Sequence, residues 1–154
     1  MKGNFSSWFV THPKITWSLV FLYMLIIFIL SSFPYIEQPI RVYYVYNFII
    51  TFIEHVIEYS ILGLLLFFGF LSRNIDNNGK TLNIALLAIL VSTIYGITDE
   101  IHQIFVPGRN CDIIDVIADL IGSCIGVFIG KLLSNQIQTQ FPCKFNCLSE
   151  FIHV

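Results

Sequence analysis

The sequence predicts an all-α integral membrane protein, built as a bundle of four transmembrane helices. Of its 154 residues, 56% are hydrophobic and only 12% are charged, and the mean hydropathy is +0.77. A soluble domain carries about 25% charged residues. Four long apolar runs are separated by short polar segments, and each run can cross a hydrocarbon core of about 30 Å. The lipid bilayer is therefore the expected partner, and the net charge of −2 argues against nucleic acid.

The first transmembrane helix is expected at residues 15–33. Thr11 is available as its N-cap, and Pro13 is tolerated in the first helical turn. The Ser-Ser-Phe-Pro segment at residues 31–34 ends the run. This run is long for the apolar part of a signal peptide, and no small-residue cleavage site follows it, so we interpret it as a retained helix.

The second helix is expected at residues 48–71, and its first half carries Glu54, His55 and Glu58. Residues three and four positions apart share one face of a helix, so these three side chains occupy one sector. Ionisable groups inside a membrane span face protein or water rather than lipid. This sector should therefore face the interior of the bundle.

The third and fourth helices are expected at residues 82–98 and 113–133. A polar segment at residues 73–80 precedes the third helix. Pro107 and Gly108, which suit the two central positions of a type II turn, lie between the third helix and the fourth. Residues 1–133 thus form one predicted domain, followed by a more polar C-terminal tail at residues 134–154.

The fourth helix contains a stripe of small residues, with one glycine in each of three successive turns. Such a stripe allows two helix backbones to approach closely. The partner is either a neighbouring helix or another copy of the protein, so a homo-oligomer is one expectation. The stripe consists of Gly122, Gly126 and Gly130.

The distribution of Lys and Arg predicts the orientation in the membrane. Only Arg41 and Arg109 fall in the first and third loops. The positive-inside rule then places both termini in the cytoplasm and these two loops outside. The other six basic residues are Lys2, Lys14, Arg73, Lys80, Lys131 and Lys144.

This orientation brings acidic side chains from three helices to one level in the outer leaflet. Because they outnumber the nearby Arg109 and two histidines, some of them should be protonated, or a cation should be present. A divalent cation is therefore one candidate cofactor. The acids are Glu54, Glu58, Asp99, Glu100, Asp112, Asp115 and Asp119.

Each candidate residue in this pocket has a functional and a structural interpretation. Arg109 suits a bidentate grip on a phosphate or carboxylate, or else it neutralises neighbouring acids. His55 and Glu58 suit a base and its orienter, a proton relay or a metal-ligand pair, or else a buried pair that joins two helices. The ligand-binding candidates are Asp99, Glu100, Gln103, Arg109, Asp112, Asp115 and Asp119, and the metal-ligand candidates are Glu58, Asp99, Glu100 and Asp115.

Asp112 and Asp115 also suit the first turn of the fourth helix as capping residues. Asp119 lies two turns into the helix, where capping fails as an explanation. Since Asp112, Asp115 and Asp119 are three and four residues apart, they share one face, which continues into Gly122. Asp119 is therefore expected to be a buried residue of the site.

These residues resemble the VanZ-like family of membrane proteins over about residues 10–133. The family pattern Asp-Glu-x-x-Gln-x-Phe-x-Pro-Gly-Arg, then an acidic or serine position, then Asp-x-x-x-Asn-x-x-Gly, is matched except at Asp119, where the family usually has asparagine. The matching residues are Asp99, Glu100, Gln103, Phe105, Pro107, Gly108, Arg109, Asp112, Asp115 and Gly122, together with His55, Glu58, Tyr59, Leu62 and Gly63 in the second helix and Ser31, Ser32 and Pro34 after the first.

The resemblance implies a small multi-pass protein of the bacterial cell membrane, from a family associated with resistance to teicoplanin. Our first hypothesis is therefore an envelope protein that supports low-level glycopeptide resistance, with a pocket for an envelope lipid, a cell-wall precursor or an antibiotic group. The second is an intramembrane enzyme acting on a lipid headgroup or precursor, with His55 or Glu58 as general base and a divalent cation. The third is a purely structural role in helix packing and assembly.

Overall fold

The computed structural model describes residues 5–34, 41–73 and 81–140, which form five helices and no strand. A short helix, α1 (Phe5–Thr11), precedes α2 (Pro13–Ser31), α3 (Arg41–Leu71), α4 (Thr81–Gln103) and α5 (Ile113–Gln140). Each of the last four contains a span that is long and apolar enough to cross a membrane. The predicted all-α fold with four transmembrane helices is confirmed. Residues 141–154 of the predicted tail lie outside the described residues.

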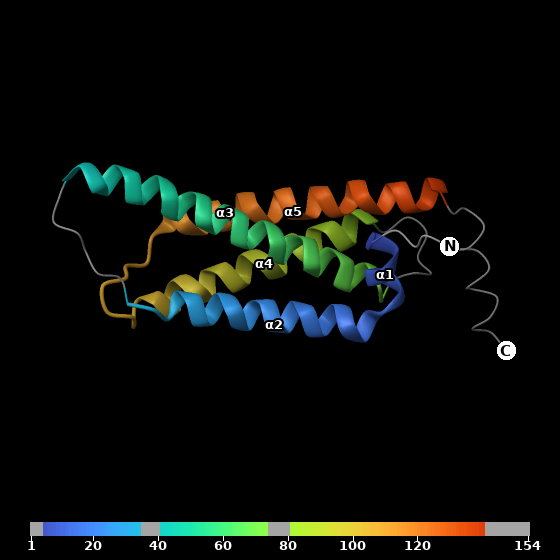
Figure 1. Ribbon diagram of the computed structural model, residues 1–154, viewed down its shortest axis with the longest axis horizontal. Coiled ribbons are helices and arrows are strands. Elements are labelled where there is room, and N and C mark those ends of the chain that lie inside the picture. Colours follow the sequence, from blue (N-terminus) through green and yellow to red (C-terminus); the bar gives the residue numbers. More distant parts are fainter. Residues whose placement is uncertain (1–4, 35–40, 74–80, 141–154) are drawn as a thin grey trace.

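The four long helices run side by side in alternating directions (Figure 1). The ends of α2 and α4 and the starts of α3 and α5 lie at the left of that view, and we call this the polar end of the bundle. Helix α1 and the C-terminal end of α5 lie at the opposite end. The predicted orientation in the membrane, with the polar end outside, stays a prediction.

Three helix boundaries differ from the predicted ones by more than two residues. Helix α3 begins at Arg41 rather than at residue 48, and α5 continues to Gln140 rather than ending at residue 133. Helix α4 continues through Asp99 and Glu100 to Gln103, although the sequence predicted an end at residue 98. In the sequence, a carboxylate that follows an apolar run resembles the end of a helix. Asp99 and Glu100 are both buried between helices, however, and the helix continues past them.

The predicted N-cap of the first transmembrane helix is wrong. Thr11 ends α1, and its hydroxyl donates to the carbonyl of Trp8 at 3.0 Å. The N-cap position of α2 is occupied by His12, which makes no capping hydrogen bond with its side chain. Helix α1, which the sequence analysis missed, is only 7 residues long and carries no span-length apolar pattern.

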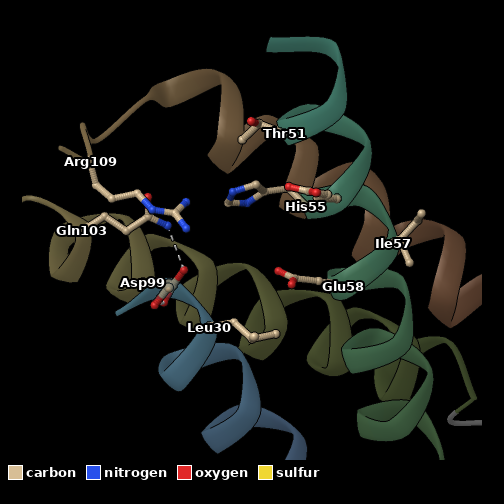
Figure 2. A pocket seen from close by; sticks show the side chains of 10 residues that line it. Leu30, Thr51, His55, Ile57, Glu58, Asp99, Gln103 and Arg109 are labelled. Carbon is tan, nitrogen blue, oxygen red and sulfur yellow. Dashed lines mark hydrogen bonds between the residues drawn. The ribbon is translucent and has the colours of Figure 1, made fainter. Parts of the chain in front are cut away.

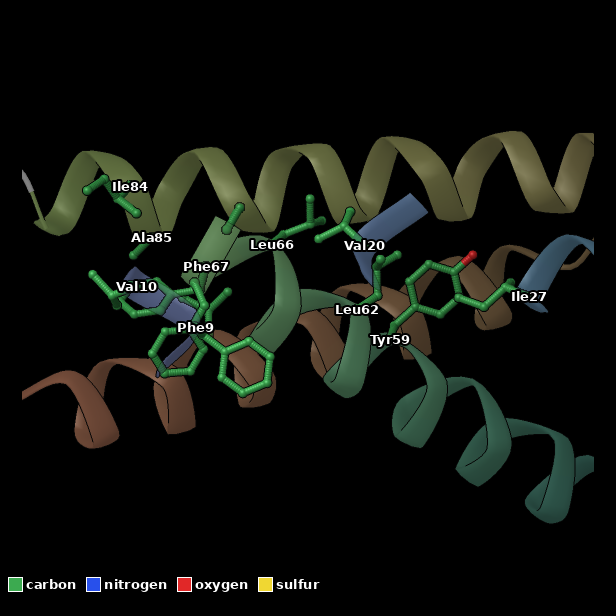
Figure 3. Packing of buried hydrophobic residues seen from close by; sticks show 13 residues of the cluster. Phe9, Val10, Val20, Ile27, Tyr59, Leu62, Leu66, Phe67, Ile84 and Ala85 are labelled. Atoms are coloured by element: carbon green, nitrogen blue, oxygen red, sulfur yellow. The ribbon is translucent and has the colours of Figure 1, made fainter. Parts of the chain in front are cut away.

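The hydrophobic core is centred on α3, which contacts α2, α4 and α5 (Figure 3). Large apolar side chains on the outer faces of the long helices are exposed, as a surface in contact with lipid requires. The core includes Phe9 and Val10 of α1, Val20 and Ile27 of α2, Tyr59, Leu62, Leu66 and Phe67 of α3, Ile84, Ala85 and Ala88 of α4, and Val127 of α5.

The most extensive contact between helices joins α3 and α5 through the predicted glycine stripe. A Cβ atom on Gly122 would lie 2.5 Å from the carbonyl oxygen of Val56, and one on Gly126 would overlap the carbonyl oxygen of Ser60. Gly130 faces the ring of Phe67. The stripe therefore packs against α3 of the same chain, and in this structure that face is not available to a second copy.

Candidate functional site

A buried pair formed by His55 of α3 and Asp119 of α5 lies at the centre of the polar residues. The Nδ1 atom of His55 lies 2.8 Å from Oδ1 of Asp119. His55 is 5% exposed and Asp119 is fully buried. The close approach at Gly122, one turn along α5, brings the two helix backbones near enough for this pair to form. Asp119 is the buried residue that the sequence predicted, and its partner is His55.

Gly96 of α4 provides the space for the Asp119 side chain. A Cβ atom at Gly96 would overlap the carboxylate of Asp119, so any larger residue there would displace it. The second carboxylate oxygen of Asp119, Oδ2, has no hydrogen-bond partner within the described part of the chain. Asp119 is thus enclosed by α3, α4 and α5.

Asp99 joins α4 to the end of α2. Its Oδ1 accepts a hydrogen bond from the hydroxyl of Ser31 at 2.6 Å, and its Oδ2 accepts one from the side-chain amide of Gln103 at 3.2 Å. All three side chains are at most 6% exposed. Asp99 and Gln103 were predicted as site residues, whereas the pairing of Ser31 with Asp99 was not predicted.

Glu100 joins α4 to the start of α5. Its Oε2 accepts a hydrogen bond from the backbone amide of Asp112 at 3.0 Å, while its Oε1 has no partner among the described residues. Asp112 in turn caps α5, because its Oδ1 accepts from the amide of Ile114 at 2.9 Å and its carbonyl accepts from the amide of Asp115 at 3.1 Å. The capping interpretation of Asp112 is confirmed, and it is only half-buried.

The predicted type II turn between α4 and α5 is confirmed. Gly108 has a φ angle of 77°, and the amide of Arg109 donates to the carbonyl of Val106 at 3.1 Å. The turn places Arg109 beside the end of α2, where its Nε donates to the carbonyl of Phe33 at 3.4 Å. Among the described residues the only ion pair is that of His55 with Asp119, so Arg109 makes no ion pair with any of the acids that the structure describes.

A cavity of about 450 Å³ lies between α2, α3, α4 and the α4–α5 turn (Figure 2). The Arg109 and His55 side chains point toward each other across it, and Glu58 extends into it from α3. Glu54 is exposed. The cavity is lined by Leu30, Ser31, Thr51, Glu54, His55, Ile57, Glu58, Asp99, Gln103 and Arg109.

The remaining predicted acids form a second group. Glu100, Asp112, Asp115 and Asp119 do not line the cavity, whereas His55 belongs to both groups. One ligand atom each of His55, Glu100 and Asp115 lies within 4.8 Å of the other two. Of the predicted metal candidates, Glu100 and Asp115 therefore meet in one cluster, while Glu58 and Asp99 face the cavity instead.

Three contacts that position the site were missed by sequence reasoning. Ser31 lies at the end of an apolar helix, and nothing local indicates that it pairs with Asp99. Gly96 lies three residues before Asp99. A small residue close to the Asp99-Glu100 pair was the only feature of the sequence that could have indicated space for another side chain there. Ser92 and Ser123, which share a hydrogen bond of 2.7 Å between α4 and α5, look like ordinary small residues of apolar runs.

The sequence model of the VanZ/LLP1 family matches residues 15–134. This range includes all four membrane spans except the start of the first span, at Pro13, and the end of the fourth, at Asn135. The chain belongs to the VanZ/LLP1 family. No curated protein and no solved structure matches it.

The residues that carry the VanZ resemblance come from three separate segments, and the structure brings them into contact. Ser31 pairs with Asp99, and His55 pairs with Asp119, the one position at which the chain departs from the family pattern. A Cβ atom on Gly63 would lie 2.7 Å from the carbonyl oxygen of Ser123, next to Gly122. In this VanZ/LLP1 protein, motif residues from the three segments therefore meet between the helices.

Proposed function

We propose that this VanZ/LLP1 protein lies in the bacterial cell membrane with its polar end outward and binds a polar group of an envelope lipid, a cell-wall precursor or a glycopeptide in its cavity. Through this binding it contributes to low-level resistance to teicoplanin-type antibiotics. The observation that carries the proposal is the cavity itself, which combines an arginine with carboxylates inside an otherwise apolar bundle.

The charges of the cavity favour a ligand with both anionic and hydrogen-bond-donating groups. Arg109 has no ion-pair partner among the described residues, so its guanidinium is available to a phosphate or carboxylate. Glu58 is half-buried and can accept from an ammonium or hydroxyl group. Asp99 already accepts two hydrogen bonds, and it therefore shapes the cavity more than it binds.

Envelope molecules offer this combination of groups. Phospholipid headgroups and lipid-linked precursors carry phosphates beside amines or sugar hydroxyls, and glycopeptides carry carboxylates and amines. A charge-assisted hydrogen bond contributes about 1.5–3 kcal/mol. Loss of Arg109 or Glu58 should therefore weaken ligand binding by about 10-fold to 100-fold.

The test is teicoplanin susceptibility of cells that lack the protein and are complemented at matched membrane levels. The variants are Arg109→Ala and Glu58→Gln, and the control is Arg73→Ala, which removes an exposed positive charge beyond the other end of α3. We expect wild type and the control to protect and both cavity variants to lose most of the protection.

Two results would count against the proposed function. If wild type gives no protection, the resistance role is wrong for this protein. If wild type protects and both cavity variants protect equally well, resistance does not depend on the cavity.

A further inference from the structure

We propose that His55, Glu100 and Asp115 form a binding site for one divalent transition-metal ion. The three residues come from α3, α4 and α5, so the ion would join the three helices that pack most closely. The site does not rest on the proposed resistance function, because it is defined by its own donor atoms and tested by metal binding.

The spacing of the donor atoms suits a metal ion. One ligand atom from each residue lies within 4.8 Å of the other two. In a tetrahedral zinc site with metal–ligand distances of about 2.0–2.1 Å, ligand atoms are about 3.4 Å apart. Closing this difference requires movements of about 1 Å, which small side-chain rotations within one rotamer well supply.

The pairing of His55 leaves one ring nitrogen ready for coordination. When Nδ1 donates its proton to Asp119, at the observed distance of 2.8 Å, the lone pair is on Nε2. The hydrogen bond of His55 to Asp119 uses Nδ1, so Nε2 is the nitrogen left to coordinate a metal. A carboxylate that fixes the far nitrogen of a ligating histidine is the common outer shell of metal sites. Asp119 fills that position here.

Glu100 provides a second, independent indication. The side chain is 1% exposed, Oε2 is held by the backbone amide of Asp112, and Oε1 has no hydrogen-bond partner in residues 5–34, 41–73 and 81–140. A buried carboxylate oxygen without a donor is costly. A cation bound by Glu100 together with His55 and Asp115 would supply the missing partner.

The charge balance also favours a cation. Glu100, Asp115 and Asp119 surround a single imidazole, and within the described residues no Lys or Arg pairs with them. Unpaired charges inside a span are unfavourable. A divalent ion bound by two carboxylates and a neutral imidazole leaves this ligand set without net charge. The metal-free alternative is a protonated His55 paired with Asp119.

The donor set indicates the class of metal. One imidazole with two carboxylates suits Zn²⁺ or Mn²⁺, whereas Mg²⁺ and Ca²⁺ prefer oxygen atoms alone. Asp115 is half-buried, which gives an ion a route to the site. His55 also lines the cavity, so the proposed metal site and the cavity share this residue.

The experiment uses the full-length protein, purified in detergent, stripped with a chelator and titrated with Zn²⁺ or Mn²⁺. Bound metal is measured by elemental analysis, and Co²⁺ loading gives an absorption spectrum. We expect one equivalent in wild type and at least about 10-fold weaker binding in Glu100→Gln and Asp115→Asn. The matched control is Glu54→Gln, which removes an exposed acid from the helix of His55 and should bind metal like wild type.

Asp119 supplies a test that a merely structural cluster would not pass. Asp119→Asn retains an oxygen that accepts the Nδ1 proton of His55, so its metal affinity should stay within a few-fold of wild type. Asp119→Leu removes that acceptor and should weaken binding by about 10-fold to 100-fold. Circular dichroism and gel filtration check that each variant is folded. If a variant at the buried Glu100 or Asp119 does not fold, Asp115→Asn still tests the site, because Asp115 is only half-buried.

Either of two results would overturn the site. The first is wild-type protein that binds neither ion at micromolar concentration after stripping, which would leave the protonated His55 pair as the explanation of the cluster. The second is metal binding by the Glu100 and Asp115 variants that is as tight as in wild type. A thiolate charge-transfer band in the Co²⁺ form would then identify cysteine ligands such as Cys143 and Cys147.

Discussion

Replacing Gly126 by alanine tests whether direct backbone contact between α3 and α5 stabilises the bundle. A Cβ atom there would overlap the carbonyl oxygen of Ser60 and lie 2.7 Å from the Ser60 carbonyl carbon and 2.9 Å from the Leu64 amide nitrogen. Ordinary contacts of this kind begin at 3.4 Å. Because all three obstacles are backbone atoms, the two helices must separate rather than a side chain rotate.

The expected loss of stability follows from two opposing effects. Overpacking a close contact costs about 1–3 kcal/mol, and a backbone obstacle places Gly126→Ala near the upper value. Replacing glycine by alanine within a helix stabilises the helix by about 1 kcal/mol, because alanine has the higher helix propensity. We therefore expect the free energy of unfolding of Gly126→Ala to fall by about 2 kcal/mol.

The control is Gly69→Ala on α3. A Cβ atom there would lie 3.4 Å from the ring of Trp17, an ordinary contact. Only the helix-propensity gain then applies, so this variant should be as stable as wild type or up to about 1 kcal/mol more stable. Unfolding is followed by circular dichroism as SDS is added to detergent micelles, and light scattering after gel filtration gives the oligomeric state.

Two outcomes would refute this reasoning. The first is a Gly126→Ala protein that unfolds at the same SDS fraction as wild type. The second is a variant that dissociates from an oligomer while its unfolding is unchanged, because the stripe would then act between copies rather than within one chain.

Two further predictions concern the polar end. Ser31→Ala leaves Oδ1 of Asp99 without its donor and should lower the free energy of unfolding by about 1–3 kcal/mol. The control is Ser32→Ala at an exposed position, which should change the free energy of unfolding by less than about 0.5 kcal/mol. Equal effects of the two substitutions would contradict the buried hydrogen bond. Cys111, which is exposed near the start of α5, should react with a membrane-impermeant maleimide in intact cells if the polar end is outside, and labelling of Cys111→Ser cells gives the background. Labelling of Cys111 only after cell lysis would reverse the predicted orientation.

The architecture could be predicted from the sequence because hydropathy determines which segments cross a membrane. Four apolar runs gave four spanning helices, and the Pro107-Gly108 pair gave the turn before α5. The boundaries depended on tertiary contacts instead. The predicted third helix ended before Asp99, since the sequence cannot indicate that Ser31, in a different helix, satisfies this carboxylate.

The site was predicted as a region but not as a set of partners. Helical spacing placed His55 and Glu58 on one sector, and the excess of acids indicated that groups from three helices must meet. Which groups touch depends on how the helices pack. His55 pairs with Asp119, 64 residues away, while Glu58 faces the cavity. Spacing within one helix carries no information about which residue of a neighbouring helix lies opposite.

The position of Asp119 links the packing of the bundle to its polar chemistry. Its carboxylate fits between the helices because α4 has Gly96 opposite and because Gly122 brings α5 against the backbone of α3 at Val56. A side chain at either glycine would move α5 outward or displace the carboxylate, and the 2.8 Å contact with His55 would lengthen. Small residues that look like simple packing positions therefore determine how His55 is oriented. Substitutions at Gly96 should accordingly alter the polar cluster even though glycine itself contributes no donor or acceptor side chain.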